Sequence, residues 1–352
     1  MATTGRTTAA SGRAAASALL DAAFVRVTAA PTGGSLAAAA LLADACDDRS
    51  VPYQVRVARS APAPEAVDAT HVVVGVDAPD ADASFAADAP NEAFEAAREL
   101  GADPSPVLAF AGALADGGEP SSVVREAAGL ERRPGVGVPT ADLAAGLAHS
   151  TLVHASFSGD EQAAGALLAE LALPTELDAG ARRRLASVVA LDATESGSER
   201  SADAVADALR PHETPGGPFE TVEGYADVLG ALAYDAPGLG VALALEAADR
   251  PAALDAWRQH AADAHRIVRS ADPARHRGVV VVDADAAHST VARLVRDYRS
   301  AEPAALAVGD DVAALATTDA DARDVLPGGV GSASVAVGDA AEDLVETVRG
   351  ER

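Results

Sequence analysis

The sequence predicts an α/β protein with an N-terminal parallel-sheet domain, a helical connector and a smaller C-terminal α/β domain. Short apolar runs alternate with Ala- and Leu-rich helical stretches before roughly residue 130. The middle of the chain shows only helical periodicity, and strand–helix alternation returns after roughly residue 250. We therefore expect a disordered tail over residues 1–20, a first domain with its connector over 21–200 and a second domain over 215–352. The boundary is expected between about residues 195 and 218.

The first domain opens with a strand over residues 24–27, a loop of small residues over 28–35 (TAAPTGGS) and a helix starting near Leu36. Such loops follow the carboxyl ends of parallel strands, where α/β proteins bind their ligands. The loop 28–35 is therefore the first place to expect a site. Further strands are expected over 53–57, 71–77 and 106–111, and helices over 91–100 and 121–129.

The rest of the chain divides into the helical connector and the second α/β unit. We expect helices over 140–148, 159–173, 178–191, 201–209, 219–234, 251–268, 286–298 and 339–349, and strands over 277–283, 304–308, 312–317 and 334–337.

Composition limits the class of protein. About half of the residues are apolar but only 3% are aromatic, so the core is expected to consist of Ala, Val and Leu. No uninterrupted apolar run reaches 18 residues, so no transmembrane helix is expected, and the N-terminus lacks the apolar core of a signal peptide. Cys46 is the single cysteine, which excludes a disulfide framework or a Cys-rich zinc site. These features predict a cytoplasmic protein that does not enter a membrane.

The chain is strongly acidic, with 53 Asp and Glu against 27 basic residues, all of them Arg, and a net charge of −26. This composition fits a GC-rich genome and a halophilic proteome, in which acidic surfaces keep proteins solvated. Because the Debye length is only about 3 Å in ~1 M salt, the charge does not decide whether the chain binds nucleic acid.

The loop 28–35 has hydroxyl groups and glycines but no Asp, Glu, His or Cys. A Walker A loop requires a lysine, and a dinucleotide fingerprint requires GxGxxG, and neither is present. The free amides at the start of the helix suit an anion. Two interpretations remain open: a nucleotide-binding loop, or a strand–helix turn that allows close packing.

Two acidic residues, Asp77 and Asp192, each follow an apolar run and are candidates for half of a metal site. Hydrolysis with two metal ions needs more ligands than these two supply. The eight histidines show no metal-ligand spacing such as HxH or HExxH, so we interpret them as surface or core residues.

A basic stripe is expected on the helix 286–298 and its end, where Arg293, Arg296 and Arg299 recur every three residues. These arginines either contact phosphates or only offset nearby acids. The turn that begins at Gly328 and Gly329 offers backbone amides for a phosphate, or else forms a hairpin-like turn.

Ordered segments resemble the DHH phosphoesterase superfamily, in particular archaeal RecJ-like proteins, along nearly the whole chain. The most specific is PGGPFETVEGYADVLGALA (215–233), similar to the segment that enters the C-terminal part of archaeal members. The others are the strand–loop–helix at 25–46 with PYQVRVAR (52–59), HVVVGVDA (71–78), and VARLVRDYRSAEPAALAV (291–308) with GGVGSASVAVG (328–338). The resemblance implies a DHH-like first domain and a DHHA1-like second domain.

The departures from the family pattern concern its metal ligands. With Gly34 placed on the family glycine, Ala29, Pro31 and Gly33 stand at the positions of the His and two Asp of the first motif. The chain contains no Asp-His-His triplet, and Val330 replaces the histidine of the family's GGH turn. The resemblance leaves only Asp77 and Asp192 as remnant catalytic candidates. We therefore expect no bound Mn or Mg and little or no nuclease activity.

The resemblance implies a catalytically degenerate scaffold, or a component that contacts single-stranded DNA, in DNA replication or repair. RecJ-like proteins of archaea and eukaryotes associate with GINS and the MCM helicase, which are the implied partners. The nucleic-acid candidates are Arg293, Arg296, Arg299, Gly328 and Gly329. One alternative is a Mn- or Mg-dependent 5′–3′ single-strand exonuclease or phosphodiesterase with rearranged ligands. Another is a nucleotide-binding regulator that uses the loop 28–35.

Overall fold

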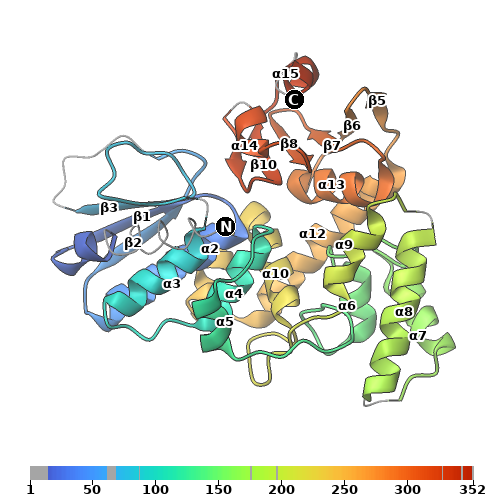
Figure 1. Ribbon diagram of the computed structural model, residues 1–352, viewed down its shortest axis with the longest axis horizontal. Coiled ribbons are helices and arrows are strands. Elements are labelled where there is room, and N and C mark those ends of the chain that lie inside the picture. The colour runs from blue at the N-terminus through green and yellow to red at the C-terminus, as the bar shows by residue number, and fades with distance from the viewer. Residues whose placement is uncertain are drawn as a thin grey trace. The chain divides into compact units, whose positions relative to one another are not determined.

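The computed structural model describes residues 15–350, apart from 62–68, 87, 175, 176, 196, 327, 342 and 343. The chain forms two compact units (Figure 1). Unit 1 is Met1–Gly129 with Leu232–Ala253, and unit 2 is Leu130–Ala231 with Leu254–Arg352. The segment 195–218, where we expect a domain boundary, lies within unit 2, and the domain division stays a prediction.

Unit 1 is built on a four-stranded parallel sheet with the order β2-β1-β3-β4. The helix that follows β1 is almost completely buried, because it packs against the sheet and three other helices. Small residues at the contact between this helix and α4 allow the close packing. A Cβ on Gly112 of α4 would lie 2.5 Å from the Cβ of Ala37. The elements of unit 1 are β1 Val25–Ala29, α2 Gly33–Asp48, β2 Tyr53–Val57, β3 Thr70–Val74, β4 Ala83–Phe85, α3 Ala89–Glu99, α4 Pro106–Ala115, α5 Ser122–Ala128 and α11 Pro237–Ala244.

Unit 2 joins the connector helices to a six-stranded sheet with the order β5-β6-β7-β8-β10-β9. Only β6 and β7 pair in parallel, and the other pairs are antiparallel. Its elements, with α10 and α12 shared at the unit boundary, are α6 Leu143–His149, α7 Glu161–Glu170, α8 Ala179–Glu195, α9 Ser201–Ala208, α10 Val222–Asp235, α12 Arg250–Ser270, β5 Ala274–His276, β6 Val279–Asp283, α13 His288–Leu294, the π-helix η1 Val295–Arg299, β7 Ala304–Val308, β8 Val312–Thr317, α14 Ala322–Val325, β9 Val330–Gly331, β10 Val335–Asp339 and α15 Leu344–Gly350.

The expected fold class, a parallel sheet followed by helices and a second sheet, is confirmed. The strand expected over 106–111 is wrong, because α4 occupies that segment. The Ser105 hydroxyl caps the helix by accepting from the Leu108 N–H at 3.2 Å, and Pro106 starts it. The structure adds the short strand β4, which is not among the strands expected from the sequence.

The N-terminal tail expected over 1–20 falls largely outside the described residues, which begin at residue 15. Residues 15–20 are helical, and Leu19 is buried, so this part of the expected tail packs against the unit. No helix among the described residues is both long and apolar enough to cross a bilayer.

Candidate functional site

The loop after β1 leads directly into α2, which begins at Gly33 rather than near Leu36. Thr32 is the N-cap residue, and its Oγ1 accepts from the Ser35 N–H at 3.1 Å. Thr28 and Ser35 are both buried. The Thr32 hydroxyl therefore satisfies a backbone N–H at the start of the helix, and the Ser35 hydroxyl oxygen lies 2.9 Å from that of Thr32.

A carboxylate from α4 occupies the amino end of α2. Oδ1 of Asp116 accepts from the Gly34 N–H at 3.0 Å, and Oδ2 lies 3.0 Å from the Thr32 hydroxyl, which can donate to it. A Cβ built on Gly34 would overlap this carboxylate. Helix amino ends favour anions. Here the chain's own carboxylate occupies the amino end of the helix.

Asp116 is a residue of this site that the sequence does not predict. The available signal was an acidic residue that closes the apolar helix α4 and precedes two glycines, Gly117 and Gly118. That pattern indicates a helix end, and nothing in it indicates a contact 82 residues away in the sequence.

The residue after β3, the strand that pairs with β1, packs against the same loop. Gly75 follows β3 with a φ of +69°, and a Cβ there would lie 2.5 Å from Oγ of Ser35 and 3.0 Å from Cβ of Ala30. The backbone can approach so closely only because residue 75 is glycine. Asp77 lies beyond this turn with an exposed side chain. It therefore lies past the strand end rather than on it.

The donors at this loop do not fit a Mn²⁺ or Mg²⁺ ion. These ions prefer several carboxylate or carbonyl oxygens. The loop supplies the hydroxyls of Thr28, Thr32 and Ser35, and the one carboxylate, from Asp116, is already engaged by Gly34 and Thr32. Over the described residues as a whole, no group of three or more His, Cys, Asp and Glu side chains is arranged to hold a metal ion.

Asp192 belongs to unit 2, whereas Asp77 belongs to unit 1. It lies on helix α8 and accepts from both the backbone N–H and the hydroxyl of Ser156, at 2.7 and 2.6 Å. These two bonds hold the turn at Ser156 against α8. The structure thus gives Asp192 a structural role in its own unit.

The expected basic stripe does not form one exposed surface. Arg296 is only 9% exposed, whereas Arg293 is partly exposed and Arg299 is exposed. The helix expected over 286–298 is α13 followed by the π-helix η1, and Arg296 and Arg299 lie on η1. Nη2 of Arg293 donates to Thr151 O, and Nη1 of Arg299 donates to Val268 O, each at 2.9 Å. Their role in binding nucleic acid stays a prediction.

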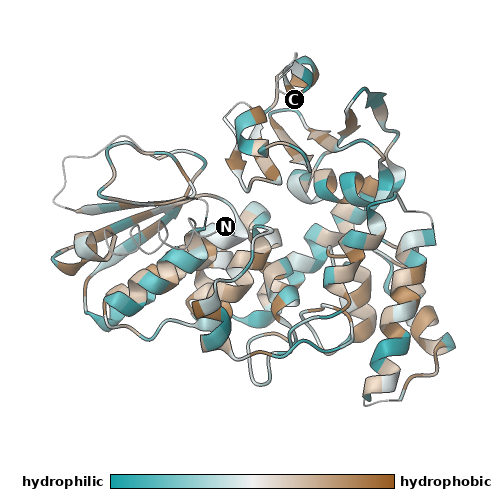
Figure 2. Ribbon diagram, in the orientation of Figure 1, coloured by the Kyte–Doolittle hydropathy of each residue, from teal (hydrophilic) through white to brown (hydrophobic). Residues whose placement is uncertain are grey.

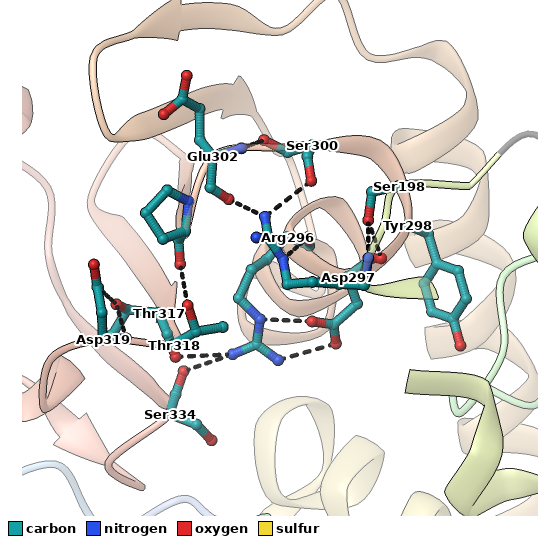
Figure 3. Close-up of polar contacts among 12 residues, drawn as sticks. Ser198, Arg296, Asp297, Tyr298, Ser300, Glu302, Thr317, Thr318, Asp319 and Ser334 are labelled. Atoms are coloured by element: carbon teal, nitrogen blue, oxygen red, sulfur yellow. Dashed lines mark hydrogen bonds and ion pairs between the residues drawn. The ribbon is translucent and has the colours of Figure 1, made fainter. Parts of the chain in front are cut away.

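The Arg296 guanidinium is held inside unit 2 (Figure 3). It forms a two-point ion pair with the carboxylate of Asp297, at 2.6 and 2.9 Å. Its Nη1 donates to the carbonyls of Thr317 and Ser334, both at 3.1 Å. An arginine used in this way joins η1 to β8 and to the segment before β10, so it is a packing element and not an open phosphate contact.

Residues 198 and 200, between α8 and α9, pack against the same π-helix. The Ser198 hydroxyl donates to Asp297 O at 2.7 Å, and Arg200 donates to the carbonyls of Arg296, Ser300 and Glu302. Carbonyls at a helix end need such donors. This segment therefore fixes the connector to the second sheet, a role that its sequence pattern does not indicate.

A half-buried histidine, His154, and a fully buried one, His265, form a pair in unit 2. Nδ1 of His154 and Nδ1 of His265 are 3.1 Å apart, and Nε2 of His265 lies 3.1 Å from Ser150 O. Burial, with the charges of Arg299 and Arg269, lowers the pKa of His154 to about 4. Burial and His154 hold the pKa of His265 well below its ordinary value. Both imidazoles are neutral near pH 7, as core histidines are.

Gly328 and Gly329 lie in the turn between α14 and β9. Gly328 has a φ of +63° and is exposed, and the Gly329 N–H donates to Leu326 O at 2.8 Å. A Cβ on Gly329 would lie 2.7 Å from that carbonyl. The turn itself requires both glycines, and any contact of its amides with a phosphate stays a prediction.

Comparison with known proteins finds relatives of this chain. It is 47% identical over 320 residues to the uncharacterized protein rrnAC1427 of Haloarcula marismortui, covering 88% of this chain and 84% of that protein. The family model for the C-terminal domain of rrnAC1427 matches residues 271–350. Among solved structures, CDC45 from Entamoeba histolytica aligns with a TM-score of 0.57 at 8% identity, over 98% of this chain and 96% of that chain.

A structure of the exonuclease RecJ bound to manganese aligns over 96% of this chain and 92% of its own, with a TM-score of 0.44 and 14% identity. At such identity the CDC45 similarity shows a shared fold and nothing about activity. The relationship to rrnAC1427 extends over most of both chains. The chain therefore belongs to the rrnAC1427 protein family.

Proposed function

We propose that this chain is a catalytically inactive protein with a RecJ-like DHH fold, which acts as a scaffold in DNA replication or repair. One observation carries the proposal: the Asp116 carboxylate fills the amino end of α2, at the loop where the resemblance places the first catalytic motif. Ala29, Pro31 and Gly33 supply no metal-ligating side chain there. A phosphate-cleaving centre at this loop would need both more ligands and an open site.

The fold shared with CDC45 over nearly the whole chain supports a replication role. The partners we propose are GINS and the MCM helicase, with single-stranded DNA as a further contact. Arg299, the exposed member of the three arginines, is the first candidate for that contact. We place the protein in the cytoplasm and expect no Mn or Mg cofactor.

Two measurements test the proposal in molar KCl. Tagged protein used as bait in an extract of the source organism should recover GINS or MCM subunits. The purified chain with Mn²⁺ should leave 5′-labelled single-stranded DNA intact, and calorimetric titration with Mn²⁺ should give no tight site. Digestion of the DNA that Asp77→Ala abolishes would establish the nuclease alternative. A bait that recovers neither GINS nor MCM would overturn the replication role.

A further inference from the structure

Helix α8 in unit 2 presents a face that no described residue covers. Leu191 is 70% exposed, the most of any large hydrophobic side chain among the described residues. Arg183, Arg184 and Ser187 are also exposed, and residues 183, 187 and 191 are four apart, on one face of the helix. The opposite face buries Leu185 and other apolar residues. We refer to Arg183, Arg184, Ser187 and Leu191 as the α8 surface.

The order of charges along α8 is the reverse of the order that stabilises a helix. Three arginines lie in its amino-terminal half, whereas Asp192 and Glu195 lie in the last turn. Acids are favourable near the amino end and bases near the carboxyl end, by about 0.3–1 kcal/mol each. Helix stability therefore does not explain these arginines.

One of the three arginines has a clear structural role, and two do not. Arg182 forms an ion pair with Glu213 at 2.5 Å. For Arg183 and Arg184, the described part of the chain provides no hydrogen bond or ion pair to the guanidinium. Figure 2 shows α8 with a hydrophilic band followed by more hydrophobic turns. A nearby acid is Asp178, whose pKa is lowered by the Ala181 N–H and, to a smaller extent, by the charges of Arg184 and Arg183. Two adjacent exposed cations beside an exposed leucine suit a partner that is both acidic and apolar.

We propose that the α8 surface docks an acidic amphipathic helix of a partner protein. Leu191 would pack against the apolar stripe of that helix, and Arg183 and Arg184 would pair with its flanking carboxylates. This inference deepens the proposed scaffold function, because it names a surface by which the chain would hold a protein.

A nucleic acid fits this surface less well. Its binding depends on several phosphate contacts and, for single strands, on aromatic side chains that stack with bases. The α8 surface has two cations and no aromatic residue. The exposed leucine would gain nothing from a phosphate backbone, whereas an apolar helix face would bury it.

The test uses the full-length protein and a labelled helical peptide with leucines on one face and glutamates beside them. Fluorescence anisotropy in 1 M KCl should show binding, and the double variant Arg183→Glu/Arg184→Glu should weaken it by about tenfold or more. Leu191→Gln should weaken it similarly. The matched control Arg275→Glu/Arg277→Glu, which changes two other exposed arginines of unit 2, should bind like the unchanged protein.

Several outcomes would overturn the inference. These are absence of peptide binding up to about 1 mM, equal binding by the double variant, and equal binding of a peptide with lysines in place of the glutamates. A single-stranded oligonucleotide that binds at the α8 surface, or a concentration-dependent dimer that Leu191→Gln abolishes, would assign the surface to DNA or to a second copy. None of these readouts measures nuclease activity, so failure here and failure of the proposed function remain distinguishable.

Discussion

Replacing Asp116 tests whether its carboxylate substitutes for a ligand at the amino end of α2. Asp116→Ala removes the acceptor of the Gly34 N–H and the partner of the Thr32 hydroxyl. The Gly34 amide belongs to a buried helix start, so losing its acceptor carries a desolvation penalty. Asp116→Asn keeps an oxygen that can accept from Gly34 but removes the charge.

The expected loss of stability follows from the interactions that the Asp116 carboxylate makes. A hydrogen bond to a charged group contributes about 1.5–3 kcal/mol, and an anion at a helix amino end about 0.3–1 kcal/mol. Asp116 is partly exposed, which reduces both contributions, and the second lost bond, to the Thr32 hydroxyl, offsets that reduction. We expect Asp116→Ala to lower the free energy of opening of α2 by about 2–4 kcal/mol and Asp116→Asn by about 1 kcal/mol.

Hydrogen–deuterium exchange of peptides from α2 is the suitable assay, because the single tryptophan, Trp257, lies in unit 2 and reports on that unit. A loss of 2 kcal/mol corresponds to exchange that is about 30-fold faster. The exposed Asp103→Ala is the control and should change exchange little. Unchanged exchange in Asp116→Ala would show that the carboxylate does not hold the helix, and the reasoning would fail.

Three further perturbations probe the buried polar groups. The Asp227 carboxylate accepts from Trp257 Nε1 at 2.9 Å and from the backbone N–H and hydroxyl of Thr151. Asp227→Ala should therefore destabilise unit 2 by about 3 kcal/mol. Urea unfolding followed by tryptophan emission should show this loss. His154 and His265 have lowered pKa values, so the unfolded chain binds more protons between pH 6.5 and about 4. Unit 2 should therefore lose stability as the pH falls through that range, and His154→Gln should flatten the dependence. Burial, with two neighbouring acids, raises the pKa of Glu92 to about 7. At pH 8 the carboxylate is charged, which destabilises the folded state, so Glu92→Gln should raise the free energy of opening of unit 1 by up to about 1 kcal/mol. Hydrogen–deuterium exchange in unit 1 should then be slower.

Helices and strands could be predicted from the sequence where the apolar pattern fits only one of the two. The strand–loop–helix at the start of unit 1 could be predicted because apolar alternation, small loop residues and a long Ala/Leu run agree with one another. The segment 106–111 is a short apolar run, which fits a buried strand and a buried helix equally well. Ser105 and Pro106 were the local signals that favour the helix, and the apolar run obscured them.

The candidate site could not be predicted to the same extent, because long-range contacts define it. Three-residue spacing indicates that Arg293, Arg296 and Arg299 share one face of a regular helix. The π-helix changes that geometry, and an ion pair with the adjacent Asp297 draws Arg296 inside. Likewise, no local pattern connects Asp116 with Gly34, since tertiary packing brings α4 to α2.

The Asp116 contact also decides how the loop after β1 should respond to anions. A phosphate that bound the α2 amides would first have to displace the carboxylate, at a cost of about 2–4 kcal/mol, which lowers its apparent affinity by about 30- to 1000-fold. ATP or inorganic phosphate should therefore leave the thermal unfolding midpoint of the protein unchanged at millimolar concentrations in KCl. A rise in that midpoint, together with slower exchange in α2, would show that the carboxylate yields to a ligand. The nucleotide-binding alternative would then replace the scaffold as the better account of this loop.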